Sequence, residues 1–138
     1  MDTEHIPAPH PPRVLLVDDN QTHQYSLGRH LSESGFEVLH AHSGAEALKS
    51  AKEDFPDVVL LDIHLPDVLG FEVCRVLKSD PSTRSIPVIF HSATYDTQSA
   101  RSMAADLGAI SFLSYPIDID HLTSVVRGAV IRRVSDPK

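Results

Sequence analysis

Short apolar runs alternate along the chain with longer segments whose apolar residues recur every three or four positions. The short runs, such as "RVLLV" at 13–17, are typical of strands buried on both faces of a parallel sheet, and the longer segments are typical of amphipathic helices. The predicted strands are 13–17, 36–41, 56–62, 86–92 and 109–113, and the predicted helices are 20–34, 43–53, 68–79, 95–107 and a last one carrying Leu122, Val125, Val126, Ala129 and Val130. This alternation predicts an α/β domain with right-handed crossovers and helices on both faces of the sheet.

Local signals support several of these boundaries. Gly35 and Gly108 follow predicted helices, where glycine commonly ends a helix. The stretch "SGAE" at 43–46 has the spacing of a capping box, in which a serine and a glutamate three residues later satisfy backbone N–H groups at a helix start. Residues 1–12 are rich in proline and histidine without periodicity, and we expect a flexible leader there.

Composition excludes several classes of protein. A chain of 138 residues is one domain in length, and its net charge of −7 argues against nonspecific binding to nucleic acid. The single cysteine, Cys74, rules out an intrachain disulfide framework and is typical of a reducing compartment. We find neither an apolar run long enough to span a membrane nor a signal-peptide pattern, so we expect a cytoplasmic protein with no membrane contact.

The nine histidines do not form a metal-binding motif. They stand at positions 5, 10, 23, 30, 40, 42, 64, 91 and 121, without HxxxH or HExxH spacing and with one possible thiolate partner. His40 and His42 would share a face if both lay on a strand. We interpret the histidines as solvated or packed side chains.

Three aspartates are the strongest chemical signal. Asp18 and Asp19 directly follow the first predicted strand, and Asp62 ends another. Parallel strands present their carboxyl ends at one edge of the sheet, so these carboxylates would meet there if the two strands are neighbours. Two such charges repel by about 4 kcal/mol at an effective dielectric of 20, and three pairs by roughly 10 kcal/mol. A hard divalent cation, best Mg²⁺, would remove this repulsion. The alternative is that Asp18 or Asp19 simply forms the turn or caps the next helix.

The chain resembles the receiver domains of two-component response regulators. The resemblance is carried, in order, by "VLLVDDN", "VVLLDIHLPDVLGFEVCRVLK", "IPVIFHSA", "GAISFL" and "PID". It implies a flavodoxin-like doubly wound (βα)5 three-layer sandwich with strand order 2-1-3-4-5, a receiver domain at 13–132 and a charged tail at 133–138.

The resemblance also implies the roles of individual residues. Asp62 would be the phosphoacceptor, Asp19 a direct Mg²⁺ ligand, and Asp18 a ligand directly or through water. His64 would offer its backbone carbonyl to the metal. Ser92 and Phe112 would be the switch residues, one contacting the phosphoryl group and the other turning inward.

Tyr115 departs from the pattern of this family. Receivers normally have Lys before the proline that follows the fifth strand, whereas this chain reads "FLSYPID". A tyrosine hydroxyl gives one neutral hydrogen bond in place of a charge-assisted one. We therefore expect slower phosphorylation or weaker coupling to the switch, and the Tyr115–Pro116 bond could be cis. The alternative function is a pseudo-receiver that acts without phosphorylation as an interaction or dimerisation module.

The resemblance implies protein partners rather than an enzymatic substrate. The phosphoryl donor would be a sensor histidine kinase or a phosphotransfer protein, and the output would go to a downstream effector or to kinase domains of the same protein. The output face would cover residues 95–132, where a homodimer could also form. Two enzyme classes fit poorly: an aspartyl phosphatase would have an acid where His64 stands, and a dinucleotide-binding domain would have glycines in "VDDNQTHQ".

Overall fold

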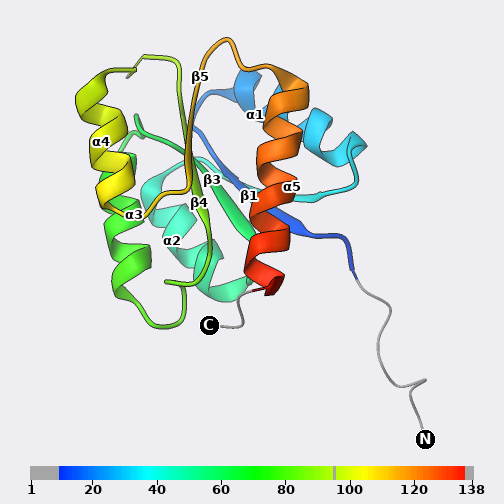
Figure 1. The fold of residues 1–138 in the computed structure, drawn as a ribbon, viewed down its shortest axis with the longest axis horizontal. Coiled ribbons are helices and arrows are strands. Elements are labelled where there is room, and N and C mark those ends of the chain that lie inside the picture. The colour runs from blue at the N-terminus through cyan, green and yellow to red at the C-terminus, as the bar shows by residue number, and fades with distance from the viewer. Residues whose placement is uncertain (1–9, 95, 136–138) are drawn as a thin grey trace, which may run out of the picture.

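Five strands alternate with five helices in the part of the chain that the structure describes, a computed structural model covering residues 10–94 and 96–135 (Figure 1). The elements are β1 Arg13–Val17, α1 Gln21–Glu33, β2 Glu37–Ala41, α2 Gly44–Glu53, β3 Val58–Asp62, α3 Gly70–Ser79, β4 Val88–Ser92, α4 Gln98–Asp106, β5 Ser111–Ser114 and α5 Ile119–Ser135. All ten predicted elements are thus confirmed. Most of the predicted leader and the last three residues of the predicted tail lie outside the described residues.

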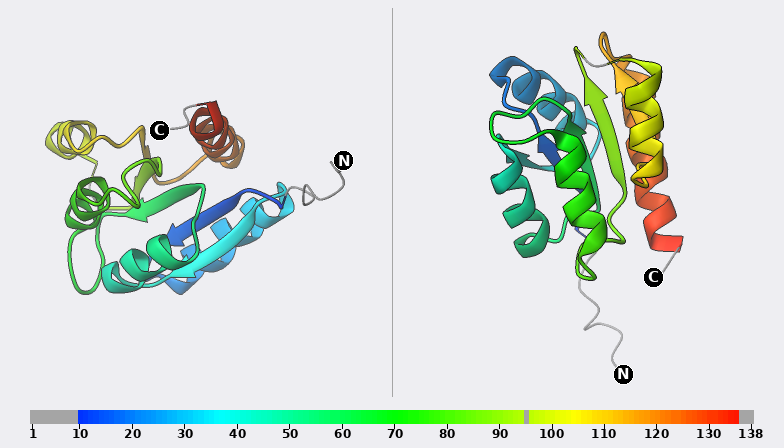
Figure 2. Two further views of the ribbon diagram at one scale, coloured as in Figure 1. Left: turned by 90° about the horizontal axis from the view of Figure 1, so that it is seen from below. Right: turned by 90° about the vertical axis from the view of Figure 1, so that its left-hand side faces the viewer.

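The strands form one parallel sheet in the order β2-β1-β3-β4-β5. Helices α1 and α5 cover one face, and α2, α3 and α4 cover the other, which gives the three layers seen in Figures 1 and 2. This is the predicted flavodoxin-like arrangement. The order places β1 and β3 side by side in the middle of the sheet, with Val17 opposite Leu61.

Alternate residues of each strand build two separate cores. On β1, Leu15 and Val17 face the α2–α4 layer, whereas Val14 and Leu16 face α1 and α5. All four are fully buried, and the apolar residues of β3 and β4 are fully buried as well, because both faces of the sheet are covered. Burying both faces explains why these strands read as continuous apolar runs rather than as alternating patterns.

Two helices begin later than the sequence pattern predicts. Helix α4 starts at Gln98 rather than at position 95, because the side chain of Thr97 accepts a hydrogen bond from the Ala100 N–H at 3.1 Å and so caps the helix. Helix α3 starts at Gly70 rather than at position 68. Gly70 donates its N–H to the carbonyl of Ile63 at 2.6 Å, which holds the preceding residues in a loop beside β3.

The glycines expected after two helices and the serine expected to cap a third are confirmed, but the capping box at Ser43 is incomplete. Gly35 and Gly108 have φ of 98° and 93°, a left-handed conformation that side chains disfavour. Ser43 caps α2 by accepting from the Glu46 N–H at 3.1 Å. The return bond of the capping box goes elsewhere: Glu46 accepts from the N–H of His42 at 2.8 Å, one residue before the cap. No helix within residues 10–94 and 96–135 is long and apolar enough to cross a membrane.

Candidate functional site

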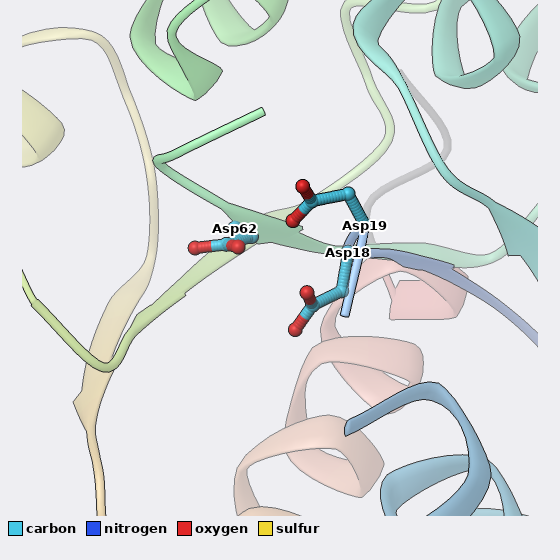
Figure 3. Close-up of side chains that lie close together, drawn as sticks. All are labelled: Asp18, Asp19 and Asp62. Carbon is cyan, nitrogen blue, oxygen red and sulfur yellow. The ribbon is translucent and has the colours of Figure 1, made fainter. Parts of the chain in front are cut away.

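Asp18, Asp19 and Asp62 converge at the carboxyl edge of the sheet. Because β1 and β3 are neighbours in register, Asp62 at the end of β3 lies beside the two residues that follow β1 (Figure 3). One oxygen from each carboxylate lies within 4.8 Å of the others. They line a cleft of about 180 Å³ together with Asn20, His23, His64, Ala93 and Thr94.

Asp62 is the carboxyl group most affected by its surroundings. It is 9% exposed, and burial together with the negative charges of Asp18 and Asp19 raises its pKa to about 7. The N–H of His64 donates to its Oδ1 at 3.3 Å and acts in the opposite direction. The predicted repulsion between the three acids is therefore present in the folded chain.

Asp18 is fully buried, and each of its polar atoms has a partner. Its Oδ1 accepts from the Asn20 N–H at 2.8 Å, and its Oδ2 lies 2.9 Å from Nδ1 of His23. Its backbone N–H donates to the Ala41 carbonyl at 3.0 Å, and its carbonyl accepts from the Gln24 amide at 2.8 Å. Asp18 thus does form a local turn, as the alternative interpretation held, but Asn20 and not an aspartate caps α1.

The three carboxylates fit a hard divalent cation. Asp19 is exposed at the mouth of the cleft, Asp62 lies deeper, and Asp18 is buried behind them. Among the described residues this is the one group of three or more histidine, cysteine or acidic side chains close enough to hold a metal ion. An all-oxygen set of acidic ligands matches the preference of Mg²⁺, and a cation there would offset the repulsion that raises the pKa of Asp62.

His40 and His42 take no part in a metal site within the described chain. His40 lies on β2 and pairs through Nδ1 with the side-chain oxygen of Gln24, while His42 follows the strand and pairs with Glu46 at 3.4 Å. Burial lowers the pKa of His40, as does the nearby His42. The interpretation of these two histidines as packed or solvated side chains is consistent with these contacts.

Tyr115 belongs to an aromatic cluster behind Asp18. Its ring stacks on His23 with centroids 4.4 Å apart and an angle of 26° between the planes. Its hydroxyl lies 3.2 Å from Nδ1 of His91, and the Tyr115–Pro116 bond is cis, as expected. Burial raises the pKa of Tyr115 well above its usual value, and the charges of Asp18 and Asp62 raise it further. The hydroxyl is therefore held as a neutral donor.

His91 and His23 are site residues that the sequence interpretation missed. His91 is fully buried on β4, and burial lowers its pKa to about 4, so that it is neutral at physiological pH. The one available signal was a histidine inside the apolar run "IPVIFHS". His23 gave no comparable signal, because it stands on the polar first turn of α1.

The two predicted switch residues lie on the neighbouring strands β4 and β5. Ser92 ends β4, is buried, and accepts from the Thr94 N–H at 3.2 Å. Phe112 lies on β5, is partly buried, and has its ring centre 6.5 Å from that of Phe90. Neither lines the acidic cleft, whereas the exposed His64 does.

Basic side chains are absent from the lining of the cleft among the described residues. Lys78, the lysine of α3, donates to the carbonyls of Arg84 and Ile86 at 3.2 and 2.8 Å. Those contacts hold it on the loop before β4, at the other end of that strand from Ser92. The cleft consequently contains three acids and two histidines without a lysine or arginine to balance them.

Comparison with known sequences gives a consistent family. Residues 14–127 match the family model described as the response regulator receiver domain. The chain is 42% identical over 115 residues to the response regulator PleD of Caulobacter vibrioides, covering 83% of this chain and 25% of PleD. It is 35% identical over 118 residues to the protein PilH of Pseudomonas aeruginosa, covering 86% of this chain and 97% of PilH. The chain therefore spans a quarter of one relative and nearly the whole of the other.

Comparison with solved structures agrees with the sequence match. The receiver domain of the sensor histidine kinase PA1611 from Pseudomonas aeruginosa superimposes with a TM-score of 0.79 at 25% identity, covering 87% of this chain and 98% of that domain. A magnesium ion is coordinated in the active-site cleft of that protein.

Proposed function

We propose that Asp62 is the phosphoryl acceptor of this chain, which belongs to the response regulator receiver domain family. Members of that family are signalling modules of two-component systems rather than catalytic enzymes, and a histidine kinase is their partner. The observation that carries the assignment is the position of Asp62: it ends β3 inside the cleft, with the carboxylates of Asp18 and Asp19 beside it.

The chemistry is a transfer of one phosphoryl group. A carboxylate oxygen of Asp62 attacks the phosphorus of a phosphohistidine, the P–N bond breaks, the imidazole leaves with its electron pair, and an acyl phosphate forms. The transition state spreads negative charge over three equatorial oxygens. A bound Mg²⁺ would supply positive charge at those oxygens. The chain itself contributes the nucleophile and the orientation of the acidic residues around it.

The metal-binding roles follow the same scheme. Asp19, exposed at the mouth of the cleft, would bind Mg²⁺ directly, and the buried Asp18 would bind directly or through water. His64 would add its backbone carbonyl. The carboxylate geometry and the magnesium ion reported for the PA1611 receiver support this set of ligands.

Tyr115 makes this receiver a variant in the proposal. The resemblance implies that receivers normally have a Lys at this place, whose ammonium contacts the phosphoryl group. Here the phenol contacts His91, and neither a lysine nor an arginine lines the cleft among the described residues. Phosphorylation would accordingly be slow, with Ser92 and Phe112 as the residues that pass the change to the face formed by α4, β5 and α5.

The partners follow from that assignment. A sensor histidine kinase or a phosphotransfer protein would donate the phosphoryl group. A downstream effector, or kinase domains in the same protein, would respond to it, and a homodimer could form through the same face.

The decisive experiment is to label Asp62 directly. The chain is incubated with Mg²⁺ and a small phosphodonor such as acetyl phosphate or phosphoramidate, and its intact mass is followed. We expect the mass of one phosphoryl group to be added in wild type and none in Asp62→Asn. Failure of every donor, with beryllofluoride also leaving the NMR spectrum unchanged, would favour the alternative: a pseudo-receiver that signals by binding alone. The hydrogen bond between Tyr115 and His91, at the position where a receiver normally has Lys, is the observation that favours this alternative.

A further inference from the structure

We propose that His23 is a positioning residue for Asp18, and that Tyr115 and His91 hold His23 in place. The inference rests on the Mg²⁺ site of the proposed function and identifies what orients its most buried ligand. Asp18 differs from Asp19 and Asp62 because it is fully buried and its oxygens are already bound. Its Oδ1 is held by a backbone N–H. Two imidazoles lie near its Oδ2, His23 at 2.9 Å and His91 at 3.8 Å, so His23 is the side chain within hydrogen-bond distance that sets its orientation.

The contact of His91 with the Val17 carbonyl determines which atom is the donor in the hydrogen bond between Tyr115 and His91. Nε2 of His91 lies 3.3 Å from the carbonyl of Val17, which can only accept, so Nε2 carries the hydrogen. The other ring nitrogen of a neutral imidazole is an acceptor, and the Tyr115 hydroxyl therefore donates to it. This hydrogen bond fixes the Tyr115 side chain against His91 of β4.

The fixed tyrosine ring then sets the plane of His23. The two rings stack at 4.4 Å with 26° between their planes, so the imidazole has little freedom to tilt. In this plane Nδ1 lies 2.9 Å from Oδ2 of Asp18, and because a carboxylate only accepts, Nδ1 is the donor. His23 is 25% exposed in its side chain and lines the cleft, so it lies between the buried cluster and the metal-binding edge.

Orientation matters here because three carboxylates must share one cation. A carboxylate that is held by two donors loses little conformational freedom when a metal binds. Outer contacts of this kind typically change metal affinity by about 10- to 100-fold when they are removed. The cleft has no described lysine or arginine in its lining, so His23 is the side-chain donor that can supply this orientation.

Two substitutions separate the two contacts of His23. His23→Phe keeps a flat ring for Tyr115 and removes the donor to Asp18. His23→Asn places an amide N–H close to the position of Nδ1 and removes most of the stacking surface. Mg²⁺ is titrated into each folded variant by NMR, with His30→Asn as the control, since His30 is an exposed histidine of the same helix.

We expect His23→Phe to weaken Mg²⁺ binding by about 10-fold, and His23→Asn to remain within about threefold of wild type. Tyr115→Phe, which keeps the stack and loses the bond to His91, should fall between them. His30→Asn should match wild type. A purely structural role for His23 would lower stability in both His23 variants without this difference in Mg²⁺ affinity.

Equal or tighter Mg²⁺ binding by His23→Phe overturns the proposal, and so does a wild-type chain that binds no Mg²⁺. Labelling of Asp62 is assayed separately on the same samples. Intact Mg²⁺ binding with no acyl phosphate in wild type would refute the proposed function and leave the positioning of Asp18 standing.

Discussion

The guanidinium carbon of Arg101 lies 4.8 Å from the centre of the Phe112 ring, so that a cation from α4 covers the aromatic residue of β5. Two further contacts hold the guanidinium there. Its Nε donates to Asp96 at 2.8 Å and its Nη2 donates to the hydroxyl of Ser114 at 2.8 Å. The hydroxyl in turn donates to Asp96 at 2.6 Å. Helix α4 and strand β5 are therefore joined directly over the residue that we propose as part of the switch.

Removing the guanidinium should weaken this junction measurably. We expect Arg101→Ala to lower the free energy of unfolding by about 1 kcal/mol, since an exposed cation–π contact and an exposed ion pair each contribute about 0.5 kcal/mol or slightly more. Urea unfolding measures the change. The control is Arg29→Ala, whose side chain pairs with Glu33 on the surface of α1 and makes no cation–π contact among those described, so its loss should be smaller. Equal losses in the two variants would show that the contact with Phe112 contributes nothing.

Removing the hydroxyl of Tyr115 should lower the free energy of unfolding more than removing that of an exposed tyrosine. Tyr115→Phe leaves Nδ1 of the buried His91 without its donor, and an unsatisfied buried acceptor costs about 1–3 kcal/mol. The matched change is Tyr25→Phe, where the hydroxyl accepts from Arg29 on the surface. We expect a loss below about 0.5 kcal/mol there. Thermal and urea unfolding of both variants test the difference, and a neutral Tyr115→Phe would contradict the assigned hydrogen bond.

The convergence of the three aspartates was predictable because it follows from the sheet. Once two apolar runs are interpreted as parallel neighbours, the positions after them must meet at one edge, whatever the side chains do. The predicted helices on both faces of the sheet also account for the two cores, since alternate positions of a strand face opposite layers. Periodicity thus placed Asp18, Asp19 and Asp62 at strand ends, and the resemblance to receiver domains implied the strand order that makes β1 and β3 neighbours.

The stack of His23 on Tyr115 was not predictable in this way. These residues are 92 positions apart, one on α1 and the other in the loop before α5. Their contact depends on how a helix and a loop settle against each other, and hydrophobic periodicity carries no information about this. The tautomer of His91 depends likewise on a carbonyl from β1 that is its partner only in the folded sheet.

Asp62 should make the stability of the metal-free chain depend on pH. Its pKa is raised from 3.8 to about 7, so the folded chain keeps a proton that the unfolded chain has released between these values. This contribution to stability is complete below pH 4 and is lost as the pH rises through 7. The shift corresponds to about 4 kcal/mol at full strength, and to about 2 kcal/mol once solvent screening in the open cleft is included.

Asp62→Asn removes the titrating carboxyl group, so the difference in stability between wild type and this variant gives the contribution of Asp62. We expect the variant to be more stable than the metal-free wild type by about 2 kcal/mol at pH 8, with the difference shrinking toward pH 4. The comparison is needed because His91 acts in the opposite sense: its pKa is lowered to about 4, so its contribution falls as the pH drops from 6.5 to 4. Unfolding curves at several pH values measure the difference, and a constant gap would contradict the raised pKa of Asp62.

Gly70 has no room for a side chain. A Cβ there would lie 2.3 Å from the backbone oxygen of Asp62 and 3.0 Å from the Cα of Ile63, both in rigid backbone. We expect Gly70→Ala to cost about 3 kcal/mol or more and to displace Asp62, reducing its labelling by a phosphodonor. Gly128 of α5 has nothing within 4 Å of the same position, so Gly128→Ala should stabilise the chain by about 0.5–1 kcal/mol. Calorimetry on the pair tests both signs.

Tyr115→Lys tests what a positive charge at this position does to phosphoryl transfer. Tyr115 lies close enough to Asp18 and Asp62 for their charges to raise its pKa, so an ammonium on the same backbone position can approach the group transferred to Asp62. We expect Asp62 to be labelled about 10-fold faster at saturating Mg²⁺, because a charged donor stabilises the transition state more than a neutral one.

The same substitution removes the ring that stacks on His23, so its two effects should separate. The Mg²⁺ concentration for half-maximal labelling should rise, while the rate at saturation also rises. Tyr115→Met supplies a long uncharged side chain as the control. It should also need a higher Mg²⁺ concentration for half-maximal labelling, but its rate at saturation should not rise. An unchanged saturated rate in Tyr115→Lys would mean that the missing charge does not limit this receiver. A faster saturated labelling rate together with a lower Mg²⁺ affinity is expected only if the charge and the ring have distinct roles. The two measurements therefore separate the effect of charge on phosphoryl transfer from the effect of the ring on Mg²⁺ binding.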